Sequence, residues 1–194
     1  MSKSAYSKKL QLEELALFSD LSIGQGIDIA SRVIRISEDI EEGHFNWFDA
    51  AMNIMEKFNP RKTIVVKIHT YGGDLYSALG IIARMKESSC RIHTKGYGKM
   101  MSAGALMLAA GDKRSMSKIS TLMHHEPSYG VEGRHSEVAN HVRQAQTESD
   151  RWASLMCEFT GTDKQFWKRL GYNGKDLYIN ADEALRLHVV DEVF

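Results

Sequence analysis

The sequence is poor in cysteine and in proline, with two of each in 194 residues. The two cysteines, Cys90 and Cys157, are too few for the disulfide framework of a small secreted protein or for a cysteine-based metal site. This scarcity favours a reducing compartment, and we expect the protein in the cytoplasm. No Pro-rich or Gly/Ser-rich linker divides the chain, so we expect one folded unit of ordinary size.

An excess of charge of one sign is also absent, because Lys plus Arg and Asp plus Glu both number 25. The composition gives no electrostatic reason to expect nucleic acid or a membrane surface as a partner. No apolar run has the length of a transmembrane helix, and the basic first nine residues are not followed by the apolar core of a secretory signal.

Short β-branched runs alternate with segments whose apolar residues recur at helical spacing. This order predicts an α/β fold with a largely parallel sheet and crossover helices. The predicted strands are 32–36, 63–68, 90–94 and 189–193, and the predicted helices are 47–58, 75–85 and 102–110.

A much longer helix is predicted at about 135–159, with an apolar stripe on one side and a polar face on the other. A helix of this length would extend beyond a compact α/β core and leave apolar surface for a neighbouring molecule. The stripe is Val138, Val142, Ala145, Ser149, Trp152, Met156 and Phe159, and the polar face is Glu137, Asn140, Arg143, Glu148 and Arg151.

Ser102, which lies between small residues at the start of an apolar run, is a candidate nucleophile. Such a serine usually does no more than begin a tightly packed helix. Here a glycine pair (Gly72–Gly73) ends an upstream strand, a histidine pair follows the serine, and Asp176 precedes the last helix. A nucleophile, a base, an orienting acid and an oxyanion-hole glycine are the parts that acyl transfer requires.

The adjacent histidines, His124 and His125, compete for the role of base. Alternation along a strand would send them to opposite faces, so only one can reach Ser102. Together with His135 and His141 they also suggest a metal site, but His-Glu-x-x-His is absent and adjacent strand residues cannot both face one ion. We therefore expect no metal, and no glycine-rich fingerprint indicates a nucleotide or another cofactor.

Four segments, in order between about Arg32 and Phe194, resemble the caseinolytic serine peptidase family, ClpP. The segment Ile68-His69-Thr70-Tyr71-Gly72-Gly73 is similar to the family's Ile-Asn-Ser-Pro-Gly-Gly, and Ser102-Ala103-Gly104-Ala105 with Leu108-Ala109-Ala110-Gly111 is similar to Ala-Ser-Met-Gly-Ala…Leu-Ala-Ala-Gly. His125-Glu126-Pro127 is similar to His-Gln-Pro, and Lys175-Asp176-Leu177-Tyr178 with Ala181-Asp182-Glu183-Ala184 is similar to Arg-Asp-x-Phe-Met-Ser-Ala-x-Glu-Ala.

The resemblance implies a ClpP/crotonase-like β-β-α superhelix over residues 31–194, with the helix at about 135–159 as a protruding handle and residues 1–30 as a divergent segment. It also implies a serine endopeptidase in which Ser102 is the nucleophile, His125 the base and Asp176 the orienting acid.

The same resemblance implies that the backbone amides of Gly73 and Ala103 form the oxyanion hole. Gly72 and Gly73 would bind the substrate as an added strand. Asp182 is discounted as the acid, because the first turn of the last helix already suits a carboxylate.

By resemblance the partners are other copies of the chain, in a ring of seven that stands alone or is doubled, and unfolded polypeptide substrates. Since the sequence has no ATP site, an AAA+ unfoldase would have to supply the energy for degrading folded proteins.

Some positions depart from the family pattern. Val65 and Lys67 stand where the family commonly has aromatic residues that dock the unfoldase, and Gly174-Lys175 stand at the usual ring-pairing positions. Tyr71 and the Met100-Met101 pair are expected to reshape the substrate cleft.

These departures leave other functions open: a weakly active or regulatory subunit that assembles with another ring, a viral capsid-maturation protease, and a crotonase-type acyl-CoA enzyme. The last of these needs no nucleophile.

Overall fold

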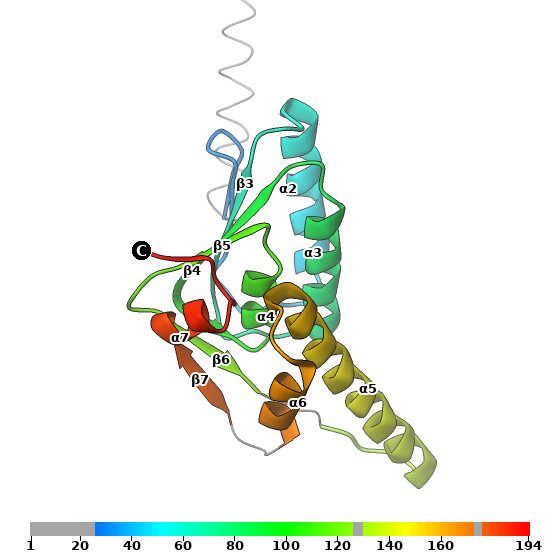
Figure 1. Ribbon diagram of the computed structural model, residues 1–194. Helices are drawn as coiled ribbons and strands as arrows, with labels where there is room; N and C mark the ends of the chain where they lie inside the picture. Colours follow the sequence, from blue (N-terminus) through cyan, green and yellow to red (C-terminus); the bar gives the residue numbers. More distant parts are fainter. Residues whose placement is uncertain (1–25, 126–129, 173–175) are drawn as a thin grey trace, which may run out of the picture.

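The computed structural model describes residues 26–125, 130–172 and 176–194, which form a sheet with helices on one face and a long helix projecting beyond it (Figure 1). The strands are β1 (Ile27–Asp28), β2 (Val33–Ile36), β3 (Ile64–Thr70), β4 (Ile92–Met101), β5 (Lys113–Met116), β6 (Thr121–His124), β7 (Leu177–Asn180) and β8 (Glu192–Val193). The helices are α2 (His44–Phe58), α3 (Leu75–Glu87), α4 (Ala103–Ala109), α5 (His135–Thr160), α6 (Lys164–Tyr172) and α7 (Ala181–Arg186).

This architecture confirms the predicted α/β fold class with a protruding helix. The expectations for most of the segment 1–30 and for Gly174-Lys175 fall outside the described residues. None of the helices in the described ranges is both long and apolar enough to cross a membrane.

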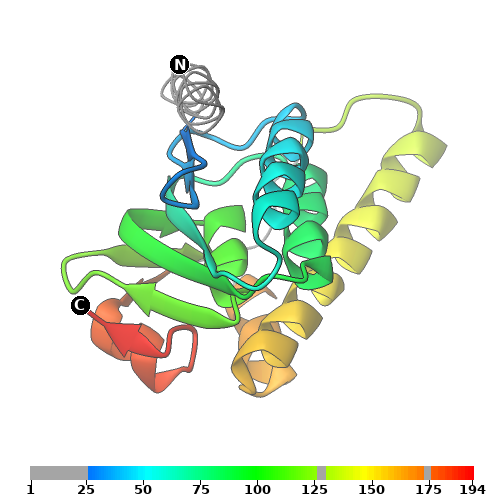
Figure 2. The same cartoon turned by 90° about the horizontal axis from the view of Figure 1, so that it is seen from above.

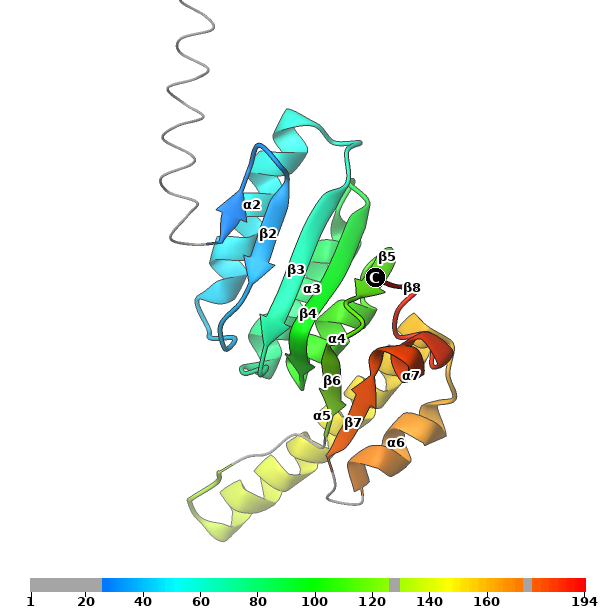
Figure 3. The ribbon, with the colours of Figure 1, turned by 90° about the vertical axis from the view of Figure 1, so that its left-hand side faces the viewer.

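The sheet is organised around β4, whose two halves have different neighbours. Its first half lies parallel to β5, through the pairs from His93 with Lys113 to Gly96 with Met116. Its second half lies parallel to β6 instead. Across the described part the order is β1-β2-β3-β4-β5-β8, with β6 joined to the second half of β4 and β7 antiparallel to β6 (Figure 3). Strands β6 and β7 thus form a second, shorter layer of strands, which is joined to the sheet through the last residues of β4.

The strand predicted at 90–94 is too short, because β4 continues through two glycines. Between the pairs Ile68 with Gly96 and Thr70 with Met100 the register shifts, which marks a bulge. Gly98 lies in this bulge with φ +60°, and a Cβ there would come within 2.7 Å of the His69 ring. Glycine is therefore required at the bulge for both its backbone conformation and its contact with His69.

The C-terminal strand predicted at 189–193 is too long. Val189 and Val190 donate their amides to the carbonyl of Ala184 at the end of α7, so only Glu192–Val193 pairs with β5. The side chains of the two valines are buried in the core, and their backbones are not part of the pairing with β5.

One face of the sheet is covered and the other is open. In β3, Ile64, Val66 and Ile68 are fully buried, whereas the alternate residues Val65 and Lys67 are only half-buried. Figure 3 looks onto the open face, with α2, α3 and α4 behind the strands. All seven residues of α4 are buried, so this helix lies at the centre of the core.

Helix α5 packs on the core with its C-terminal half and projects with its N-terminal half (Figures 1 and 2). Trp152 and Met156 of the predicted stripe are buried, but Val142 is 63% exposed. The placement of Glu148 on the polar face is wrong, because its side chain is 2% exposed. The reason is that α5 passes the start of α3, where Tyr76 contacts the Glu148 carboxylate. Gln144, one turn earlier on α5, donates to the same carboxylate.

His124 joins the second layer of strands to the helices. It is 3% exposed, and its ring centroid lies 5.2 Å from that of Trp152 in α5 and 5.5 Å from that of Trp167 in α6. Burial lowers the pKa of His124 from 6.5 to about 4, and a backbone contact with Trp167 opposes this shift only in part. The folded protein therefore holds this imidazole neutral.

We expect acid to destabilise the fold through His124. Between pH 6.5 and about 4 the unfolded chain binds a proton that the folded chain does not, so stability is full above pH 6.5 and falls as the pH drops towards 4. The loss from this residue is about 3 kcal/mol at most. Denaturant unfolding between pH 7 and 4 measures it. His124→Phe should flatten the profile, whereas the exposed control His135→Gln should not, and parallel profiles for all three proteins would contradict the assignment.

Candidate active site

Ser102 is the single residue between β4 and α4, and it turns the chain sharply from strand to helix. Its backbone has φ 52° and ψ −122°, a region that non-glycine residues rarely adopt. Its amide donates to the carbonyl of Met123, 2.8 Å away, which holds the turn in place. A strained turn of this kind raises a serine hydroxyl out of the sheet, as in the nucleophile elbow of hydrolases, although the surrounding Gly-x-Ser-x-Gly sequence is absent.

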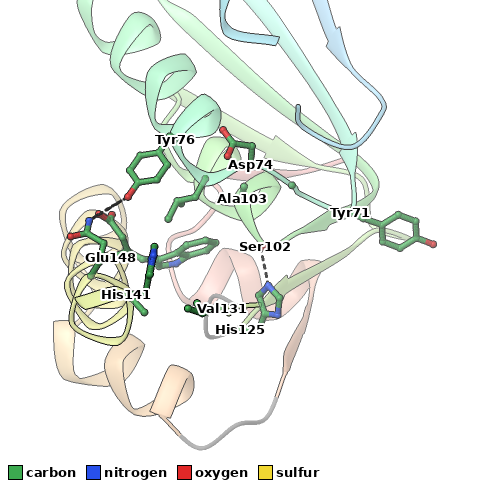
Figure 4. Close-up of a pocket in the computed structure, with 14 residues that line it drawn as sticks. Tyr71, Asp74, Tyr76, Ser102, Ala103, His125, Val131, His141 and Glu148 are labelled. Atoms are coloured by element: carbon green, nitrogen blue, oxygen red, sulfur yellow. Dashed lines mark hydrogen bonds between the residues drawn. The ribbon is translucent and has the colours of Figure 1, made fainter. Parts of the chain in front are cut away.

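His125 follows β6 directly, and its Nε2 lies 2.8 Å from Ser102 Oγ (Figure 4). The strand pairing allows this contact, because Met101 pairs with Met123 and the ends of β4 and β6 therefore lie side by side. In this register His124 is level with Ser102, and His125 is the next residue along. His124 is directed the opposite way into the core. The structure therefore brings His125, and not His124, to Ser102.

Asp176 precedes β7, where the antiparallel pairing of His124 with Leu177 sets it opposite His125. Its Oδ1 lies 3.8 Å from His125 Nδ1, and its side chain is 49% exposed. This separation exceeds a hydrogen bond and is an ion-pair distance. Asp182 lies in the first turn of α7, as the sequence suggested.

The glycine pair runs beside Ser102 and is held from its other side. The amide of Ile40 donates to the Gly72 carbonyl (2.6 Å), and the Asp74 amide donates to the Ile40 carbonyl (2.7 Å). In this parallel bridge the N–H and C=O of Gly73 face away from Ile40. Gly73 lines the same cavity as Ser102, so its amide lies on the side away from Ile40.

Only glycine fits at these two positions. A Cβ on Gly72 would lie 2.8 Å from the Ser102 Cβ, and one on Gly73 would collide with the backbone of Ile40. Thr70 fixes the pair further, because its hydroxyl accepts from the Gly72 amide (3.0 Å) and donates to the Glu38 carbonyl (2.7 Å). Sequence reasoning missed Thr70, although its place two residues before the glycines fits the short-range side-chain bond of an ST turn.

A cavity of about 630 Å³ opens at Ser102 and extends between the start of α3 and the middle of α5 (Figure 4). The predicted site residues Gly73, Ala103, Ser102 and His125 all line it. Its walls also include side chains that sequence reasoning did not select, and these are Leu75, Tyr76, Gln144, Ala145, Glu148 and Trp152.

The residues that were expected to reshape the cleft lie in different places, and Tyr71 is among those that line the cavity. The side chain of Met100 is fully buried in the core, beside Gly96. Tyr71 stands at the rim with its ring turned outward (Figure 4), and Lys99 Nζ lies 3.1 Å from the ring centroid. Within the described ranges, no three His, Cys, Asp or Glu side chains are placed to hold a metal ion.

Comparison with known proteins gives a consistent result. The sequence profile of the family described as Clp protease matches residues 26–194. One relative is the ATP-dependent Clp protease proteolytic subunit 1 of Prochlorococcus marinus subsp. pastoris (strain CCMP1986 / NIES-2087 / MED4), which is 30% identical over 167 residues, or 85% of this chain and 84% of the relative. The protein of the same name from Prochlorococcus marinus (strain MIT 9312) is also 30% identical over 167 residues, or 85% of each chain.

We expect Gly72→Ala to distort the turn at Ser102. The added Cβ meets Ser102 at 2.8 Å, and the backbone at φ +104° is strained for any other residue, so the substitution should cost about 2 kcal/mol of stability. Labelling of Ser102 by a fluorophosphonate should slow roughly a hundredfold, as misplaced reacting groups do. Gly43→Ala is the matched control, because nothing lies within 4 Å of its Cβ. Equal labelling rates in the two variants would refute the close approach.

Proposed function

The chain belongs to the Clp protease family, and from this premise we propose that it is a serine endopeptidase that cleaves unfolded polypeptides with Ser102, His125 and Asp176 as its triad. The observation that supports this most directly is the 2.8 Å contact between Ser102 Oγ and His125 Nε2 at a strained strand-to-helix turn. A serine hydroxyl is a weak nucleophile until a base accepts its proton, and this contact provides the base.

In the first half of the proposed reaction, Ser102 Oγ attacks the carbonyl carbon of the scissile peptide and its proton moves to His125 Nε2. The carbonyl oxygen becomes an oxyanion, which accepts hydrogen bonds from the amides of Gly73 and Ala103. The tetrahedral intermediate then collapses, the C–N bond breaks, and His125 gives the proton to the departing amine. An acyl group remains on Ser102.

In the second half, a water molecule attacks the acyl carbon and gives one proton to His125. The C–Oγ bond breaks, His125 returns the proton to Ser102 Oγ, and a carboxylic acid product leaves. Asp176 stabilises the imidazolium that forms in each half and holds Nδ1 as the protonated nitrogen. The present 3.8 Å separation would have to shorten for a direct hydrogen bond.

The segment Gly72–Gly73 is the proposed binding edge for the substrate backbone. Ile40 occupies one side of Gly73, and the other side faces the cavity. An extended peptide can pair there as an additional strand, which aligns its carbonyl with the nucleophile. Folded proteins cannot present such a strand, and this accounts for the unfolded substrate.

We further propose a ring of seven copies, single or doubled, that encloses the active sites. The projecting half of α5 carries exposed apolar side chains such as Val142, which a neighbouring copy can cover. The two free cysteines, Cys90 and Cys157, agree with action in the cytoplasm.

A regulatory subunit that assembles with another ring is the second candidate. The distance between His125 and Asp176 favours it, because 3.8 Å is too long for an orienting hydrogen bond. A crotonase-type enzyme is disfavoured by the Ser102–His125 contact, which acyl-CoA chemistry of that type does not require. Modification of Ser102 by a fluorophosphonate, located by mass spectrometry, separates an active peptidase from a regulatory subunit.

Ser102→Ala should reduce the cleavage of small fluorogenic peptides by about a thousandfold or more, because only the oxyanion hole and binding remain. His125→Ala should be similarly inactive, and His124→Phe should keep activity because His124 faces the core. Initial rates measure this, and unchanged light scattering shows that assembly is intact. A Ser102→Ala protein as fast as the parent would exclude the proposed nucleophile.

Coupling to an unfoldase should be weak. Lys67 lies on the open face of the sheet, in register with Arg35 and Lys95, and its Nζ stands 5.7 Å from the Tyr97 ring centroid. A basic surface binds an apolar docking loop weakly, because the charged groups would lose their hydration. We expect short peptides to be cleaved without ATP and a folded, tagged protein to survive with a generic ClpX-like partner. In pull-downs with the ATP-bound unfoldase, Lys67→Tyr should bind better, whereas Lys57→Tyr on exposed α2 should not. Tight binding by the parent chain, unchanged in Lys67→Tyr, would refute this.

A further inference from the structure

The cavity beside Ser102 ends in a buried carboxylate. The side chain of Glu148 is 2% exposed. Its Oε1 accepts a hydrogen bond from Gln144 Nε2 (2.6 Å) and a long one from Tyr76 Oη (3.5 Å). Figure 4 shows Tyr76 and Glu148 together at the end of the cavity away from His125, and Gln144 lines the same cavity. A polar cluster therefore lies where a substrate side chain that enters past Ser102 would end.

The second carboxylate oxygen of Glu148 has an ion-pair contact but no hydrogen bond among the described residues. Oε2 has no hydrogen-bond partner in the described part of the chain, and its ion-pair contact is with Arg151 Nη1 at 3.3 Å. Arg151 is 49% exposed and does not line the cavity. Burying a carboxylate is unfavourable unless it is paired and hydrogen-bonded, so the site is arranged to accept a further donor.

The carboxylates on the described cavity wall are not matched there by lysine or arginine. Among the described residues that line it there are two carboxylates, Glu148 and Asp74, and no lysine or arginine. Asp74 caps α3 through the Ser77 amide at 2.7 Å. Two histidines, His125 and His141, are the basic side chains on the described part of the wall. A cation that enters the cavity thus meets a net negative lining.

The cavity wall also has apolar side chains. Leu75 comes from α3, Ala145 and Trp152 come from α5, and all three line the cavity. Lysine and arginine combine a long apolar stem with a cationic head. Either side chain therefore suits a cavity that has apolar walls and a carboxylate at its end. An apolar side chain of similar length would satisfy the walls and leave the carboxylate desolvated without a new partner.

Resting on the proposed peptidase function, we propose that this cavity receives the side chain of the residue whose carbonyl Ser102 attacks, and that Glu148 selects lysine or arginine there. A pocket built to bond a polar group discriminates strongly against an analogue that lacks it. The expected preference for a basic over an apolar residue at this position is tenfold or more in kcat/KM.

The test uses the full chain and a set of fluorogenic peptides that differ only in the residue before the scissile bond: Lys, Arg, norleucine, Leu or Glu. The parent protein should favour Lys and Arg. Glu148→Gln should lower the Lys-to-norleucine ratio of kcat/KM about tenfold or more, mainly through KM. Glu148→Asp, which keeps the charge, should retain the preference in part. Glu158→Gln, on the exposed side of the same helix, is the matched control and should leave the ratio unchanged.

Fluorophosphonate labelling of Ser102 in each protein separates the two proposals. If Ser102 is labelled and the parent favours norleucine or Leu, or if Glu148→Gln keeps the basic preference, the role of Glu148 is overturned and the peptidase stands. If Ser102 is not labelled and no peptide is cleaved, both proposals fail. A Glu148→Gln protein that does not fold is recognised by lost labelling, and the parent panel with Glu148→Asp then decides.

Discussion

The pairing of the second half of β4 with β6 is the interaction on which the site depends. Met101 pairs with Met123, and the Ser102 amide donates to the Met123 carbonyl. This register places the residue that follows β6 within hydrogen-bond reach of the serine hydroxyl. A shift by one residue would exchange His125 for His124, because successive strand side chains face opposite ways. The same shift would move a neutral, buried imidazole to the surface and strip Trp152 and Trp167 of their neighbour.

The packing of the core holds this strand register in place. Helix α4 follows Ser102 at once and is buried along its whole length, so the turn cannot move without disturbing close packing. Glycines permit the approach of three segments at this point. Gly72 lies against Ser102, and Gly104 against Thr70, at distances that exclude a Cβ. Rigidity at the turn is what keeps the serine in a strained conformation.

Helix α5 serves both the core and the cavity. Trp152 packs on His124 with one part of its surface and lines the cavity with another. One turn earlier, Glu148 is buried at the far end of the same cavity. The packing that stabilises the second layer of strands therefore also positions the side chains that a substrate would meet. Changes in this helix are expected to affect stability and selectivity together.

The sequence by itself determined the class of fold, the positions of β2, β3 and helices α2 to α5, and the order of the chemical groups. Hydrophobic periodicity sets these features locally, and the four family-like segments selected Ser102, His125 and Asp176. Tertiary structure alone decided which groups meet. The 2.8 Å contact of His125 and the 3.8 Å separation of Asp176 follow from pairing between strands distant in the chain. Glu148 looked like a solvated residue because helical periodicity does not reveal what crosses a helix. Its burial is a consequence of where α5 meets α3, which no local pattern encodes.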